Sequence, residues 1–81
     1  MQALSGMAKQ QHNNTLGRVV RQRREALGWS QEALALAVGY TDRSTIAKIE
    51  EGIFEPSWSK VKRLAKVLGL SVEVFLDASE R

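Results

Sequence analysis

The sequence contains no cysteine, and His12 is the single histidine among its 81 residues. Without thiols, neither a disulfide framework nor a thiolate metal site can hold the chain together. No cluster of aspartate or glutamate accompanies His12, and no glycine-rich phosphate loop is present. Neither a catalytic triad nor a metal centre can be assembled from such a sequence. We therefore expect a protein that is not an enzyme and that uses no metal or other cofactor.

Long apolar runs are also absent, and no stretch approaches the roughly 18 apolar residues needed to cross a membrane. Residues 1–14 are polar and lack the apolar block of a signal peptide. Together with the lack of cysteine, this predicts a cytoplasmic protein without a membrane partner. Hydrophobic residues make up 43% and charged residues 26% of the chain, near the averages of globular proteins. We expect one small domain, stabilised by its own core or by a core completed through oligomerisation.

Charge is unevenly distributed along the chain, whose formal net charge is +3. Residues 1–30 carry five basic groups and one acid, and residues 56–70 carry four basic groups and no acid. Between them, residues 31–55 carry five acids and only two basic groups. Two basic segments thus flank an acidic middle, which favours a polyanionic partner without demonstrating one.

Helical periodicity begins at Thr15 and recurs in short segments, each bounded by a glycine or by a polar capping residue. Most of these segments are too short to be stable as isolated helices, so their apolar faces must share one core. The sequence therefore predicts an all-α fold, a compact bundle of five helices. The expected helices span residues 15–27, 31–38, 43–51, 56–68 and 72–77. They form one domain over 15–77, between a flexible tail at 1–14 and a short tail at 78–81.

The second and third expected helices have the spacing of a helix-turn-helix. Ala35 is small where the two helices cross, and Gly39 allows a sharp turn between them. Ile46 and Ile49 would hold the third helix by one face, leaving its opposite face to solvent. A short helix held in this way can enter the major groove of DNA, which is about 12 Å wide.

At these positions the sequence resembles the helix-turn-helix domain of the Cro and lambda-repressor family, the xenobiotic-response-element (XRE) type, over residues 16–76. The resemblance rests on Arg24, Ser30-Gln31, Leu34-Ala35, Gly39, Ser44-Thr45-Ile46, Ile49-Glu50, Gly52, Pro56-Ser57, Leu64-Ala65 and Leu68-Gly69. It implies a lambda-repressor-like bundle that binds double-stranded DNA sequence-specifically. Such a protein regulates transcription, mostly as a repressor, and acts as a homodimer on a near-palindromic operator. No small-molecule effector is expected, because 81 residues leave no room for an effector domain.

The resemblance assigns base contacts to four residues of the third helix, namely Arg43, Ser44, Ala47 and Lys48. Arg43 would bind guanine O6 and N7 in a bidentate manner, although a phosphate contact is the alternative. Lys48 would bind guanine or the DNA backbone. Ala47 would touch a thymine methyl group or, being small, simply let the helix sit deep in the groove.

Phosphate contacts are implied for a second set of residues: Gln31, Thr45, Ser57, Lys60 and Arg23. Gln31 begins the second helix, where its side chain and the backbone amides would hold a phosphate. The alternatives are structural: Thr45 and Ser57 could serve only as local caps, and the helical arginines could form no more than a solvated face. The acidic residues Glu51 and Glu55 follow the third helix and would repel phosphate.

Two structural roles also follow from the resemblance. Arg24 and Glu50 occupy positions that commonly form an ion pair between the first and third helices, which would set the angle of the recognition helix. Leu70, Val74 and Phe75 are expected to build a two-fold dimer interface. The alternative for Phe75 is a place in the core of the monomer.

A different interpretation also remains open. Ile53 and Phe54 are apolar residues on an acidic loop where the family usually has charged side chains. An antitoxin-like or adaptor module, whose main partner is another protein, would fit this feature.

Overall fold

The structure, a computed structural model, describes residues 15–75. Four helices are bounded in it: α2 (Thr15–Ala26), α3 (Gln31–Val38), α4 (Arg43–Glu50) and α5 (Trp58–Leu68). A short helical turn follows at residues 72–75, and no strand occurs in the described range. The fold is therefore all-α, as the sequence predicts. The expected tails at 1–14 and 78–81, and the end of the last helix, lie outside the described residues.

Polar side chains begin three of the helices, and left-handed glycines end two of them. Ser30 precedes α3 and accepts a hydrogen bond from the Ala33 amide at 3.0 Å. Ser57 similarly caps α5, with 3.4 Å between its Oγ and the Lys60 amide nitrogen. Gly39 ends α3 at a φ of 101°, a backbone conformation that would be strained for any residue with an L side chain. These local signals explain why the observed helix bounds lie within two residues of the predicted ones between residues 15 and 68.

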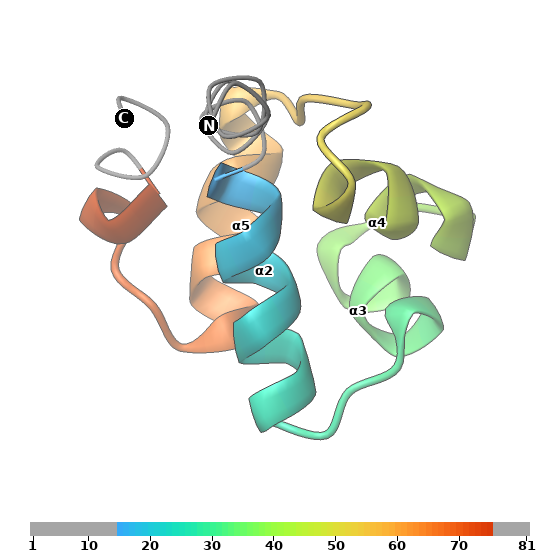
Figure 1. The fold of residues 1–81 in the computed structure, drawn as a ribbon, viewed down its shortest axis with the longest axis horizontal. Helices are drawn as coiled ribbons and strands as arrows, with labels where there is room; N and C mark the ends of the chain where they lie inside the picture. Colours follow the sequence, from blue (N-terminus) through green and yellow to red (C-terminus); the bar gives the residue numbers. More distant parts are fainter. Residues whose placement is uncertain (1–14, 76–81) are drawn as a thin grey trace, which may run out of the picture.

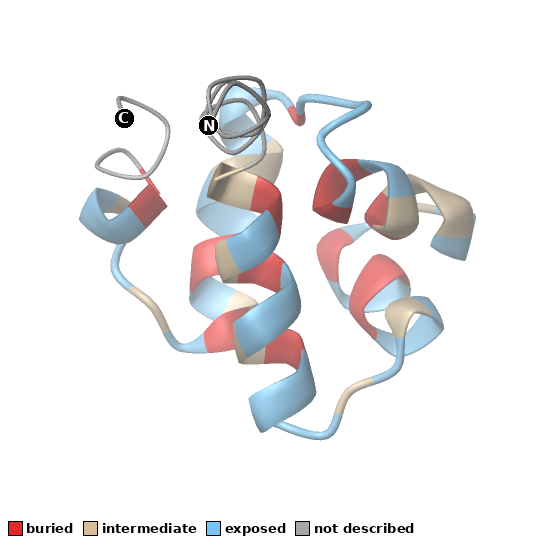
Figure 2. Ribbon diagram, viewed as in Figure 1, coloured by how far each residue is buried: buried red, intermediate tan, exposed pale blue. Residues whose placement is uncertain are grey.

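The helices enclose one apolar core. In Figure 1, α2 lies in front of α5, while α3 and α4 lie together on one side of this pair. The buried faces of the helices turn towards one another in Figure 2. The core consists of residues from every described helix and from the last turn: Val20, Leu34, Ala35, Val38, Ile46, Ile49, Leu64, Ala65, Leu68 and Phe75.

Phe75 corrects one expectation from the sequence. The dimer interface was predicted to contain Leu70, Val74 and Phe75, yet only 1% of Phe75 is exposed. The 72–75 turn folds back so that the ring completes the core, and a domain this small has few other large side chains with which to build one. Val74 is 38% exposed, whereas Leu70 is half-buried against the core. Of the three, Val74 and the exposed part of Leu70 are available to a second copy.

Candidate nucleic-acid interface

Helix α4 is held by one face and presents the other to solvent. Ile46 and Ile49 are 0% and 1% exposed, and they face the core that α2, α3 and α5 complete. Arg43 and Lys48 are exposed, while Ala47 is half-buried. Ser44 and Thr45, the other predicted contact residues of this helix, are also half-buried. The structure thus brings the four predicted base-contact residues together on one eight-residue helix.

An ion pair fixes the carboxyl end of α4 to α2. Arg24 Nε donates to Glu50 Oε2 at 2.6 Å, and Arg24 Nη2 donates to Glu50 Oε1 at 3.2 Å. A third bond runs from Arg24 Nη1 to the Trp29 carbonyl at 2.8 Å. The side chains of Arg24 and Glu50 are only 10% and 4% exposed. Hydrogen bonding to Glu50 raises the pKa of Arg24, and the two bonds to the carboxylate make the contact bidentate.

Gln31 joins this ion pair from the start of α3. Its side-chain Nε2 donates to Glu50 Oε1 at 3.1 Å. The amide group therefore has a fixed orientation, and its nitrogen carries a second hydrogen that this bond does not use. The expected phosphate contact of Gln31 stays a prediction, but the structure adds a role that the sequence did not reveal. Gln31 links α3 to the same carboxylate that holds α4.

The amino end of α4 carries a carboxylate that the sequence did not assign to the site. Asp42 is the N-cap: its Oδ1 accepts from the Ser44 amide at 3.0 Å, and its Oδ2 accepts from Ser44 Oγ at 2.9 Å. These hydrogen bonds, the backbone one first, lower the pKa of Asp42, so the group is ionised at neutral pH. An aspartate two residues before a serine at a helix start was the available signal.

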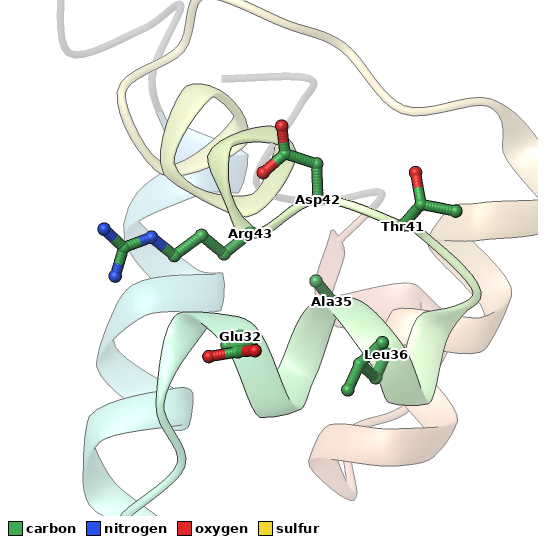
Figure 3. A pocket seen from close by; sticks show the side chains of 6 residues that line it. All are labelled: Glu32, Ala35, Leu36, Thr41, Asp42 and Arg43. Carbon is green, nitrogen blue, oxygen red and sulfur yellow. The ribbon is translucent and has the colours of Figure 1, made fainter.

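A hollow of about 230 Å³ separates the start of α4 from α3. Its lining consists of Glu32, Ala35, Leu36, Thr41, Asp42 and Arg43 (Figure 3). In this view the Arg43 side chain extends outward on the side where the Glu32 carboxylate also lies.

The remaining predicted phosphate contacts occupy two different places. Ser57 is exposed and caps α5, and its Oγ lies 3.3 Å from that of Ser59. Lys60 places its Nζ 5.3 Å from the centroid of the Tyr40 ring, so its charge lies at the turn between α3 and α4. Both residues, at the start of α5, therefore stay candidates for contact with the DNA backbone.

Arg23 has a different environment from the other predicted phosphate contacts. Its Nε donates to the Leu68 carbonyl at 2.8 Å, so the cation caps the carboxyl end of α5. This bond ties α2 to α5 rather than to α4. Its phosphate contact stays a prediction, although the side chain is already engaged within the fold.

Comparison with known proteins identifies the family. The model of a helix-turn-helix family, HTH_3, matches residues 20–75, which include all four bounded helices except the start of α2. The chain belongs to this XRE-type helix-turn-helix family. The predicted resemblance is therefore confirmed, and α3 and α4 are the two helices of the motif. Regulation of transcription through DNA binding is the activity of this family of regulators.

Three relatives agree with this family assignment. An uncharacterized HTH-type transcriptional regulator of Methanothermobacter thermautotrophicus is 43% identical over 51 residues, which are 63% of this chain and 72% of that protein. The clp gene regulator ClgR of Corynebacterium glutamicum has a TM-score of 0.75 at 25% identity, covering 85% of this chain and 72% of that one. The restriction-modification controller protein C.AhdI of Aeromonas hydrophila has a TM-score of 0.71 at 32% identity, covering 78% and 94%.

Two further observations concern other kinds of site in this helix-turn-helix protein. Within residues 15–75, no group of three or more histidine, cysteine, aspartate or glutamate side chains is placed to hold a metal ion. None of the helices described here has the length and apolar character required to span a lipid bilayer.

Proposed function

We propose that this protein binds double-stranded DNA sequence-specifically as a homodimer and represses transcription from a near-palindromic operator. The observation that carries the proposal is how the fold holds α4. Its buried face is held by Ile46, Ile49 and the Glu50 ion pair, and its exposed face offers Arg43 and Lys48. A helix attached through one face, with cationic side chains exposed to solvent, suits the major groove.

The proposed contacts divide into base readout and backbone positioning. Arg43 reads guanine, with Ser44, Ala47 and Lys48 as the other residues that reach base edges. Gln31, Thr45, Ser57 and Lys60 position the helix on phosphates. The loop that follows α4 contributes repulsion instead, because Glu51 and Glu55 are exposed carboxylates. Affinity therefore depends on the cationic side chains of α4 and α5, together with Arg23 on α2, the remaining proposed phosphate contact.

Salt dependence of duplex binding tests the proposal. We expect the logarithm of the binding constant to fall linearly with the logarithm of salt concentration, by about 0.9 for each phosphate neutralised. Fluorescence anisotropy with operator-like duplexes selected from a random pool measures this slope. A single-stranded oligonucleotide of the same sequence is the control. A binding constant that does not change with salt concentration, or a selection that enriches no duplex, would contradict the proposal.

Two substitutions separate base readout from backbone positioning. Arg43→Ala is expected to lower the affinity for the selected site by about 1–3 kcal/mol while changing affinity for random duplex much less. Gln31→Ala is expected to lower the affinity for the selected site and for random duplex by the same factor, because a phosphate contact carries no sequence information. Titrations of each variant against specific and random duplex measure the two effects. Equal losses on both duplexes in the Arg43 variant would remove it from base readout.

The homodimer is expected to form through the carboxyl-terminal turn. Val74 is exposed on this turn, which lies at the end of the molecule away from α4 in Figure 1. Val74→Asp should convert dimers to monomers, because two buried carboxylates would face each other across a two-fold axis. Sedimentation velocity gives the mass, and Glu73→Asp is the control on the neighbouring exposed position. A Val74→Asp protein that stays dimeric would place the interface elsewhere.

One observation supports a second candidate function. Ile53 and Phe54 are 70% and 43% exposed, and they lie between Glu51 and Glu55 on the loop after α4. An antitoxin-like or adaptor module would use such a surface to bind another protein. The two functions differ in their response to Ile53→Ser: the substitution would abolish binding of a protein partner but leave duplex affinity within about twofold, since small surface changes alter free energies by roughly 0.5 kcal/mol.

A further inference from the structure

The first turn of α4 presents hydrogen-bonding groups of opposite polarity side by side. Arg43 is exposed, and a guanidinium group can only donate. The residues on either side of it are bonded to each other, because Ser44 Oγ donates its hydrogen to Asp42 Oδ2 at 2.9 Å. The Asp42 carboxylate can only accept, and the Ser44 hydroxyl has no second hydrogen to offer. Asp42 and Ser44 therefore present lone pairs only.

The DNA backbone is an unsuitable partner for these two acceptors. Phosphate oxygens are negatively charged and have no hydrogen to donate, so they repel an exposed carboxylate. Base edges in the major groove differ in this respect. Adenine N6 and cytosine N4 donate hydrogen bonds there, whereas guanine O6 and N7 and thymine O4 accept them.

We propose that Asp42 and Ser44 form an acceptor pair that selects adenine or cytosine beside the guanine bound by Arg43. This inference rests on the proposed function, because it assigns a base preference to the same recognition helix. Asp42 has two roles in this arrangement, since it accepts from the base and also orients Ser44. Its carboxylate holds the hydroxyl hydrogen of Ser44 and thereby decides which base edges the hydroxyl oxygen can meet.

The N-cap makes this polarity a fixed property of the helix. Asp42 Oδ1 accepts from the Ser44 backbone amide at 3.0 Å, so the carboxylate cannot rotate without losing the cap. Oδ2 is then held beside Ser44 Oγ. Arg43 and Lys48 add positive charge near the carboxylate and favour its ionised form. The two hydrogen bonds thus orient the carboxylate and the hydroxyl relative to each other.

Asp42→Asn is the decisive variant, because it retains a capping side chain and reverses the polarity of the pair. The asparagine oxygen can accept from the Ser44 amide, and its NH₂ group then takes the place of Oδ2 and donates to Ser44 Oγ. This releases the hydroxyl hydrogen of Ser44 for a base. Glu25→Gln is the matched control, since it removes one negative charge from an exposed position on α2.

The experiment selects bound molecules from a random duplex pool with the wild-type protein and three variants, Asp42→Asn, Ser44→Ala and Glu25→Gln. We expect the wild type to enrich adenine or cytosine next to a guanine. In the Asp42→Asn protein, the enrichment of guanine or thymine relative to adenine or cytosine at that one position should rise by about tenfold. Ser44→Ala should weaken the preference there, and Glu25→Gln should return the wild-type motif. Circular dichroism verifies that each variant is folded.

Two results would overturn the inference without contradicting the proposed function. They are a wild-type motif with guanine or thymine at this position, and an unchanged motif in the Asp42→Asn protein. If Asp42→Asn does not fold, Ser44→Ala decides, because an unaltered preference in that variant excludes a role for the hydroxyl. If the wild type enriches no duplex at all, the proposed function fails and the inference falls with it.

Discussion

Replacing Glu50 with alanine is expected to lower the free energy of unfolding by about 3–5 kcal/mol. The substitution leaves the Arg24 guanidinium, which is 10% exposed, without its bidentate partner in a desolvated site. It also removes the acceptor that Gln31 uses, so α3 and α4 lose a shared attachment. The total free energy of unfolding of a native protein is about 5–15 kcal/mol, so this loss is a large fraction of it. Urea denaturation followed by circular dichroism measures it.

The neighbouring glutamate provides the control. Glu51 is exposed and has no ion pair among residues 15–75, so Glu51→Ala should change stability by less than about 0.5 kcal/mol. Replacing both partners, as in Arg24→Met with Glu50→Leu, should restore most of the stability because no charge is then left unpaired. Equal effects of Glu50→Ala and Glu51→Ala would show that the pair does not hold α4.

Phe75→Ala is expected to lower the free energy of unfolding by about 3–5 kcal/mol. The ring is 1% exposed and is among the largest fully buried side chains of the described residues, so its removal leaves a cavity between the helices. Val74→Ala, one residue earlier and 38% exposed, is the matched control and should cost far less. Thermal unfolding of both variants, measured at two protein concentrations, provides the comparison.

Protein concentration separates the core role of Phe75 from a dimer role. If the ring fills the core of one chain, the destabilisation is the same at low and high concentration. An interface residue would instead make the loss depend on concentration, because association stabilises only the assembled form. A concentration-dependent loss would return Phe75 to the interface and contradict its burial within the monomer.

Local signals in the sequence account for most of the fold. Ser30, Ser57 and the glycines at 39 and 69 fix helix ends through contacts that span only a few residues, so their positions follow from local chemistry. The last turn was harder to interpret, because one short apolar segment can face either the core or a second copy. Its periodicity is the same in both cases, and only the packing of the whole chain assigns Phe75 to the core.

The candidate DNA interface likewise combines features that follow from local sequence with contacts between residues far apart in the chain. The residues that α4 exposes could be predicted, because Ile46 and Ile49 define the buried face of a helix by spacing alone. The Gln31–Glu50 bond, and the attachment of Arg23 to the Leu68 carbonyl, could not be predicted. The first joins residues 19 apart in the sequence and the second joins residues 45 apart. Helical periodicity carries no information about contacts between residues so far apart.

The sequence by itself determined the all-α class, the helix-turn-helix spacing and the outward residues of α4, because each depends on the periods and caps of single helices. The Arg24–Glu50 ion pair was also expected, through the family resemblance. Only the tertiary structure decided that Gln31 binds the same Glu50 carboxylate and which polar groups the amino end of α4 presents. Those properties depend on hydrogen bonds whose direction is set in three dimensions, namely the bond from Gln31 to Glu50 and the Ser44 hydroxyl that donates to Asp42.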